Sequence, residues 1–264
     1  MNKWVKIVLG VIFGVGVLIL IGFSNKHQLN QIMEAPEINL EIQEGVTLIT
    51  EDEIRFKLSA EGLYQEEVKR SELDIRAIED YLLNLNEIEE AEVFTKLGSQ
   101  WFINVKARTP YARIIRKNRD GFYIDSRGKL MKLSATIKPR VLVFTGIEKL
   151  IPQNITYAEL INNDSLITKY HLSDIYRISS YVCNSVFYTA QIVQVHYSEK
   201  EGFILIPRVG KHEIIFGMAA SDEIVEKKFN KLTTFYEEVI PYEGWSKYKS
   251  INLKFDNQIV AKKN

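Results

Sequence analysis

The amino-acid sequence predicts an α+β protein: a single N-terminal transmembrane helix, a small β-α-α-β-β domain, and then a mixed strand-rich β domain with two or more helices. Three observations support this fold class. An uncharged apolar run opens the chain, two capped helical patterns flanked by strand patterns follow it, and short alternating apolar runs fill most of the rest. We place a tail at 1–3, the membrane helix at 4–23, a polar linker at 24–36, the first domain at 37–108 and the second at 109–264.

The composition excludes some classes of function. The 264 residues contain 34 Lys and Arg and 34 Asp and Glu, so the chain has no excess positive charge to neutralise a phosphate backbone. We therefore expect no nucleic-acid partner. The chain has one cysteine, Cys183, so it forms no intramolecular disulfide.

The first segment is long enough to cross a membrane. The run from Ile7 to Phe23 has no charged residue, and with Trp4 and Val5 it gives about 20 residues, which span a hydrocarbon core of roughly 30 Å. Two lysines, Lys3 and Lys6, lie at the start of this segment. They predict that the N-terminus is cytoplasmic and that most of the chain is extracytoplasmic, as in a single-pass protein of the cytoplasmic (inner) membrane. The alternative is a cleaved signal peptide, but the apolar run is long for one and the only small-x-small site, Gly22-Phe23-Ser24, is weak.

The first domain is predicted from alternation and caps. Residues 38–43 alternate as a half-buried strand does, and Thr50 with Glu53 forms a capping box that opens a helix to about residue 60. A second N-cap at 71–74 precedes one apolar helical face, made of Ile75, Ile78, Leu82 and Leu85. Two strands, 88–94 and 101–107, follow with a turn at 96–99, so that two helices can cover a three-stranded sheet.

The second domain is predicted to be richer in strands. The strand patterns lie at 111–115, 121–125, 129–133, 140–144, 190–197, 203–207, 212–216 and 249–261. One helix is predicted near a Ser173 cap, with Ile175, Ile178, Val182 and Val186 on its apolar face. Another begins at Ser221, and its apolar face consists of Val225, Phe229, Leu232, Tyr236 and Val239. We expect that face to pack on the sheet.

Asp125 is the most conspicuous candidate acid. It lies in the stretch Asp-Ser-Arg-Gly between two strand patterns, where Asp suits the first and Gly128 the fourth position of a turn. A catalytic acid or base needs burial or a charged partner to shift its pKa, and we expect a hairpin tip to supply neither. We therefore interpret Asp125 and Gly128 as a structural hairpin.

Other catalytic patterns are weak. Cys183 and His171 are twelve residues apart, or roughly 18 Å on one helix, too far for a thiol–imidazole pair unless the chain folds back. The four histidines have no metal-ligand spacing, and His196 is expected on the surface. There is no G-x-S-x-G and no phosphate-binding loop. By elimination the sequence predicts a non-enzyme without metal or cofactor.

The junction at 105–114 and the following stretch 121–133 resemble a known family. Together with the β-α-α-β-β module, which looks like a POTRA domain, they are similar to the bacterial cell-division protein family FtsQ, also called DivIB. The matching residues are Pro110, Ala112, Tyr123, Ile124, Asp125 and Gly128. Ala107 and Arg108 stand where the family more usually has an acidic residue.

This resemblance implies a scaffold of the divisome, the assembly that builds the septum. In the family, the exported domain holds the bitopic division proteins FtsB and FtsL, meets other divisome proteins and helps control septal cell-wall synthesis. The implied contact is made by a partner segment that adds to the terminal edge strand of the second domain.

The sequence permits such a contact at its C-terminal end. Residues 250–261 form one long alternating pattern, and an edge strand offers unpaired N–H and C=O groups to another chain. The candidate partner-binding residues are Tyr242, Trp245, Tyr248, Ile251, Leu253 and Phe255. The alternative is an ordinary last strand whose lysines, Lys249 and Lys254, deter pairing.

Two other classes remain open. A POTRA module also occurs in protein-assembly and translocation factors, although those usually carry several copies or a β-barrel, which this sequence lacks. A membrane-anchored hydrolase would need a buried charged pair in a cleft.

Overall fold

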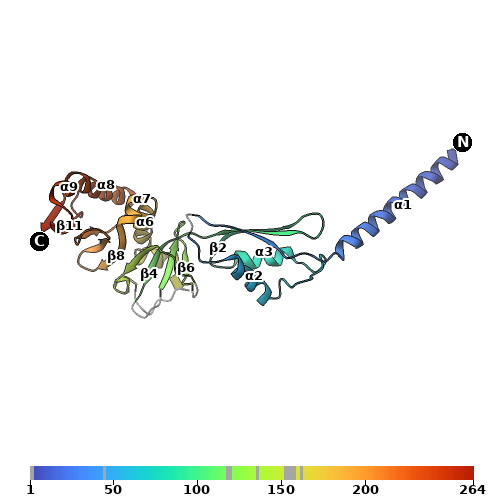
Figure 1. Ribbon diagram of the computed structural model, residues 1–264, viewed down its shortest axis with the longest axis horizontal. Coiled ribbons are helices and arrows are strands. Elements are labelled where there is room, and N and C mark those ends of the chain that lie inside the picture. The colour runs from blue at the N-terminus through green and yellow to red at the C-terminus, as the bar shows by residue number, and fades with distance from the viewer. Residues whose placement is uncertain (1–2, 44–45, 117–120, 135–136, 152–158, 161–162) are drawn as a thin grey trace. The chain divides into compact units, whose positions relative to one another are not determined.

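The computed structural model describes residues 3–43, 46–116, 121–134, 137–151, 159–160 and 163–264 (Figure 1). The chain divides into two compact units. The first consists of Met1–Ile42 and Ile49–Ala107, and the second of Gln43–Leu48 and Arg108–Asn264. The prediction had placed 43–48 in the first domain. This segment belongs to the second unit because Leu48 is buried there against Tyr123 and Met131.

The first helix, α1 (Lys3–Leu29), is long and apolar enough to span a membrane. It runs six residues beyond the apolar run, so the prediction that the linker begins at Ser24 is wrong. The reason is local: residues 24–29 contain no glycine or proline to end the helix. The rest of the expected linker is also bonded to the first unit, since the Met33 N–H donates to the Val68 carbonyl at 2.9 Å.

The folded part of the first unit has the predicted β-α-α-β-β order. Its elements are β1 (Glu37–Glu41), α2 (Glu51–Ala60), α3 (Ile75–Leu83), β2 (Ile88–Thr95) and β3 (Trp101–Ala107). The sheet order is β1-β3-β2, with β1 parallel and β2 antiparallel to the central β3. Apolar residues of both helices and of the sheet form one core, with the helices on one side of the strands (Figure 1).

Both helix caps predicted in this unit are present. The Thr50 hydroxyl accepts the Glu53 N–H at 3.2 Å, which confirms the first cap. The second cap, predicted within 71–74, is Asp74, whose carboxylate accepts the Ala77 N–H at 3.0 Å.

The second unit is built on a nine-stranded mixed sheet. Its strands are β4 (Pro110–Ile115), β5 (Gly121–Asp125), β6 (Leu130–Lys132), β7 (Leu142–Thr145), β8 (Ile192–Ser198), β9 (Gly202–Pro207), β10 (Glu213–Gly217), β11 (Tyr248–Asn252) and β12 (Val260–Lys263). Their spatial order is β12-β11-β10-β9-β8-β7-β4-β5-β6. The parallel pairs are β4–β7, β7–β8 and β10–β11, and the remaining pairs are antiparallel.

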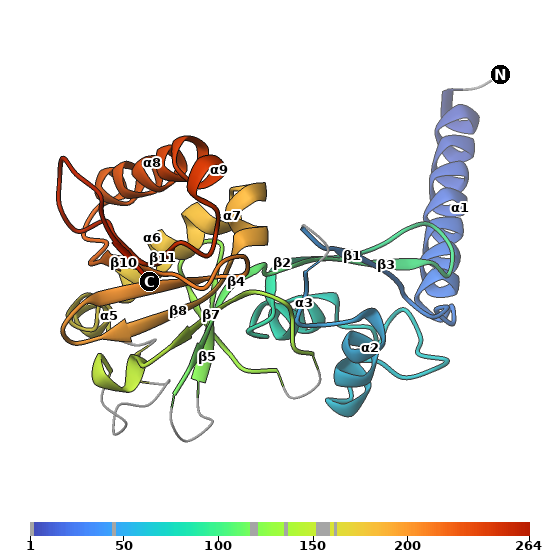
Figure 2. The same cartoon turned by 60° about the vertical axis from the view of Figure 1, so that its left-hand side comes forward.

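Helices of the second unit pack on this sheet. They are α5 (Asp164–Lys169), α6 (Leu172–Cys183), α7 (Val186–Gln191), α8 (Asp222–Glu238) and α9 (Ile240–Glu243), with a 3₁₀ turn at Ile147–Lys149. Figure 2 shows α6, α7 and α8 on the same side of the strands. The apolar face predicted for α8 is buried as expected, apart from the half-buried Val239 at the helix end.

The α6 prediction was wrong at both ends. The helix begins at Leu172, with His171 at its N-cap, instead of at a Ser173 cap. It ends at Cys183, and Val186 lies on α7 with 92% of its surface exposed. The reason is Ser185, which caps α7 by accepting the Tyr188 N–H and so starts a new helix before Val186.

Candidate partner-binding edge

The candidate site lies at the end of the nine-stranded sheet where β10, β11 and β12 are neighbours (Figure 2). Strand β11 runs parallel to β10, with Ile251 opposite Ile214. Strand β12 then pairs antiparallel with the other side of β11, and Ala261 lies opposite Ile251. At this end the edge strand of the sheet is therefore β12, while β11 is an internal strand.

The prediction of one continuous strand over 250–261 is wrong. After β11 the Asn252 side chain accepts the Lys254 N–H at 3.0 Å, which is an Asx turn. Lys231 of α8 then donates its Nζ to the carbonyls of Leu253 and Phe255, at 3.0 and 2.6 Å. These side-chain bonds take carbonyls that a continuous strand would pair, so the chain turns and returns as β12.

This topology separates the six candidate partner-binding residues. Ile251 and Leu253 are fully buried in the core, and Tyr248 is buried with its ring edge-on to Phe235 at 5.2 Å. These three side chains belong to the hydrophobic core and stabilise the sheet unit. The structure leaves Tyr242 87% exposed and Phe255 45% exposed, and Trp245 is half-buried.

The outer side of β12 presents backbone groups. The Asn264 N–H donates to the Lys247 carbonyl at 3.1 Å, and Lys263 lies opposite Tyr248. In an antiparallel ladder this makes Tyr248–Lys263 a pair without mutual hydrogen bonds, so the N–H and C=O of Lys263 point away from β11. Because the extra residue of the bulge lies on β11, the alternation along β12 is kept and Ala261 points outward too. Within the described residues no strand pairs with that side.

Basic side chains surround this edge. Lys262 and Lys263 are exposed on β12 itself. Glu243 of α9 interacts with Lys263 at 3.5 Å and with Lys247 at 3.7 Å. One carboxylate is thus shared by two of three neighbouring lysines, and the edge keeps a positive character.

A cluster of ring side chains lies where β10 and β11 begin. The Trp245 ring lies 5.1 Å from Tyr236 and stacks on His212 at 6.2 Å. His212 Nε2 is 3.0 Å from the Tyr236 hydroxyl, and burial lowers the pKa of the histidine below 6.5. The neutral imidazole therefore fits this packed site better than the charged one.

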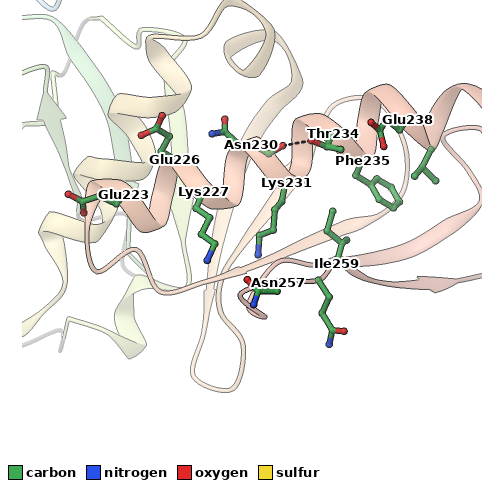
Figure 3. Close-up of a pocket in the computed structure, with 12 residues that line it drawn as sticks. Glu223, Glu226, Lys227, Asn230, Lys231, Thr234, Phe235, Glu238, Asn257 and Ile259 are labelled. Carbon is green, nitrogen blue, oxygen red and sulfur yellow. Dashed lines mark hydrogen bonds between the residues drawn. The ribbon is translucent and has the colours of Figure 1, made fainter.

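A groove lies beside the edge, between the outer face of α8 and the chain that leads into β12. It has a volume of about 790 Å³. Figure 3 shows Lys227 and Lys231 pointing from α8 toward the segment that carries Asn257 and Ile259. Phe235 lines the groove as well, and so do Glu223, Glu226 and Glu238. The lining therefore combines charges of both signs with an apolar floor.

Asp125 lies at the end of β5, and its surroundings differ from the prediction. Only 1% of Asp125 is exposed, and its carboxylate is 3.0 Å from the Arg108 guanidinium. We had expected neither burial nor a charged partner at a hairpin tip. The carboxylate also accepts the Arg127 and Lys129 N–H groups at 2.9 and 2.7 Å, and Gly128 has a φ of 78°. The turn folds back over the carboxylate, and its contacts are those of a structural ion pair.

Other candidates for chemistry are spread apart. His171 and Cys183 occupy opposite ends of α6. His196 is half-buried rather than on the surface, because its Nδ1 is 3.1 Å from the Thr145 hydroxyl on the neighbouring strand. Across the part of the chain that the structure describes, no three His, Cys, Asp or Glu side chains gather as metal ligands would.

The fold and the edge define an α+β protein with one N-terminal helix able to span a membrane, a small β-α-α-β-β unit, and a large sheet unit with a basic edge strand. Residues 109–262 match the family model described as FtsQ/DivIB, C-terminal related. This match covers more than half of the chain, and the protein therefore belongs to the FtsQ/DivIB family. A search of curated proteins gave no match. The family is one of membrane-anchored cell-division proteins, so the chain has a role in division through interactions within the divisome.

Proposed function

We propose that this protein is a non-enzymatic divisome scaffold that recruits bitopic partners of the FtsB/FtsL type by β-augmentation on β12. Through these partners it helps regulate septal cell-wall synthesis. The observation that carries the proposal is the outward direction of the Ala261 and Lys263 backbone groups on the edge strand. An extended segment can pair with these groups and continue the sheet.

The edge also indicates which segment it prefers. An edge strand of four residues with two exposed lysines opposes pairing with a second copy of itself, since like charges would face each other. A segment with acidic side chains meets complementary charge. Tyr242 is exposed and Trp245 is half-buried in the segment that leads into β11, and they are the aromatic side chains we assign to partner contact.

The proposed topology places this edge outside the cytoplasm. Lysines at the start of α1 favour a cytoplasmic N-terminus, so the sheet unit would face the partners' extracytoplasmic segments. The site is then available to single-pass proteins of the same cytoplasmic membrane.

Ala261→Pro tests the proposal. Proline removes an outward N–H of β12 and leaves the bonds from β12 to β11 in place. We expect recovery of FtsB/FtsL-type partners with the tagged full-length chain from membranes to fall at least tenfold. The matched control is Ala261→Ser, which keeps the N–H and should bind normally.

Hydrogen exchange of the β11 amides checks that the proline variant keeps its sheet. Normal partner recovery with Ala261→Pro, at unchanged β11 protection, would reject augmentation on β12. Proline at Leu253 would be a less specific test, because the Leu253 N–H donates to the Ile215 carbonyl at 2.9 Å inside the sheet.

A further inference from the structure

Backbone hydrogen bonds join the folded part of the first unit to the last residue of α1 and to the residues just after it. The apolar run ends at Phe23, and the helix continues for six residues to Leu29, which is about 9 Å at 1.5 Å per residue. The Leu29 carbonyl then accepts the Ser71 N–H at 3.0 Å, and the Gln31 carbonyl accepts the Arg70 N–H at 2.9 Å. The loop at 68–71 is therefore bonded to the first residues after the helix.

The turn between β2 and β3 belongs to the same end of the unit. The Arg70 guanidinium donates to the Thr95 hydroxyl at 2.8 Å and to the Lys96 and Gly98 carbonyls at 3.4 Å. The Glu34 N–H donates to the Ser99 carbonyl at 3.0 Å, and the Glu34 carbonyl accepts the Trp101 indole N–H at 2.8 Å. Two segments far apart in sequence, 68–71 and 95–101, are thus joined to the chain that leaves the helix.

These hydrogen bonds fix how far the loop at 68–71 and the β2–β3 turn lie from a bilayer. A headgroup layer is roughly 5–8 Å thick on each side of the hydrocarbon, from the difference between a ~30 Å core and a ~40–45 Å total. Residues bonded to Leu29 lie about 9 Å beyond the apolar run, at the outer rim of that layer. Because backbone hydrogen bonds join the loop at 68–71 to the end of α1, this loop stays close to the lipid while the unit is folded.

Exposed apolar side chains lie at this end. Leu97, at the tip of the β2–β3 turn, has 86% of its surface exposed, and Leu29 and Ile32 are 52% and 55% exposed. Lys96 is exposed beside the tip, with its Nζ 4.0 Å from the centre of the Phe102 ring. An apolar tip next to a lysine is suited to the boundary between headgroups and acyl chains.

We propose that this end of the first unit is a lipid-contact surface, the interfacial tip, in which Leu97 enters the headgroup region of the bilayer. The inference rests on α1 spanning the membrane, and it does not depend on which leaflet the tip faces or on partner binding at β12. Its consequence is that the β-α-α-β-β unit is held at a fixed height above the membrane.

The charge around the tip specifies the kind of lipid contact. In residues 24–34, 66–72 and 95–101 the numbers of basic and acidic residues are equal. The basic residues are Lys26, Lys69, Arg70 and Lys96, and the acidic ones are Glu34, Glu66, Glu67 and Glu72. Lys69 is paired with Glu72 at 3.5 Å. The contact is therefore apolar in origin and should depend little on the fraction of anionic lipid.

A quenching experiment on the full-length chain in lipid nanodiscs tests the proposal. Leu97→Cys, in a Cys183→Ser background, receives a bimane label, and the discs contain nitroxides on the headgroup or near the top of the acyl chain. The matched control is Glu92→Cys, which lies exposed on β2 five residues away, about 17 Å along an extended strand. We expect at least twofold stronger quenching at 97 than at 92, equal in neutral and anionic discs.

Equal quenching at 97 and 92 would overturn the proposal. Quenching at 97 that appears only in anionic discs would overturn the apolar contact in favour of an electrostatic one. A label at Leu18→Cys, inside α1, reports the premise separately. If acyl-chain nitroxides fail to quench it, the span itself is wrong and the inference falls with it. Partner binding at β12 is measured independently of all three labels.

Discussion

The two ends of the nine-stranded sheet are stabilised in different ways. At one end, β4, β5 and β6 follow one another along the chain, and a buried ion pair between Asp125 and Arg108 fixes their turn. At the other end, β11 reaches β10 only after the long helix α8, and Lys231 of that helix donates hydrogen bonds to the chain that leaves β11. The turn at the first end is fixed by residues close to it in sequence. The second end depends on a helix that is distant in sequence. Both ends finish in an edge strand, β6 at the first and β12 at the second.

The largest effect should come from breaking the local end. Asp125→Asn leaves the Arg108 guanidinium, whose side chain is only 16% exposed, without its negative partner. Loss of one member of a buried pair costs about 3 kcal/mol. We expect hydrogen exchange of the β5 amides to accelerate accordingly in the detergent-solubilised chain. Lys132→Gln, an exposed change on β6, is the control and should leave these amides unchanged.

This expectation differs from the one that the sequence supports. A turn-forming aspartate at an exposed tip would tolerate asparagine with a small loss of stability. Unaltered β5 protection in Asp125→Asn would show that the ion pair contributes little and would remove the contrast between the two ends.

A smaller effect is expected from loosening the other end. Lys231→Met removes two charge-assisted hydrogen bonds to backbone carbonyls after β11, worth about 1–2 kcal/mol together at this partly exposed site. Exchange should accelerate in residues 253–259 and not in β5. Lys227→Met, one helical turn earlier, is the matched control, because the Lys227 ammonium forms an exposed ion pair with Asp256 at 3.8 Å. Equal exchange in the two variants would argue against Lys231 as the cause of the bend.

The smallest effect should be a pH dependence confined to the β10–β12 end. Burial lowers the folded-state pKa of His212 below its ordinary 6.5, so the unfolded state binds the proton more readily. The stability contributed by the neutral ring is complete above pH 6.5 and is lost as the pH falls toward the lowered value. We expect β11 protection factors to drop between pH 7 and 5.5. His212→Gln should remove this dependence, and its persistence would assign the effect to another group.

The sequence predicts features that neighbouring residues determine better than features that depend on distant contacts. The Asp-Ser-Arg-Gly turn and the caps at Thr50 and Ser221 are set by neighbouring residues, so short patterns locate them. Whether Asp125 is buried depends on Arg108, seventeen residues earlier, and no local pattern reports that contact.

The sequence does contain local evidence for a break between β11 and β12, but the alternating apolar pattern masks it. Asp256 and Asn257 are turn-forming residues in the middle of 250–261, but the spacing of Ile251, Leu253 and Phe255 continues a strand pattern up to them. The deciding contact comes from Lys231 on α8. For the same reason the sequence places Ile251 and Leu253 at the partner surface, whereas the parallel neighbour β10 covers their strand.

Because β10 and β11 run in the same direction, the intervening residues 218–247 must cross over the sheet before β12 has a strand to join. Strand β12 therefore has no neighbour to pair with until this crossover has brought β11 alongside β10. Under the proposed augmentation, a partner segment that pairs with β12 would bind only those copies in which the crossover is complete.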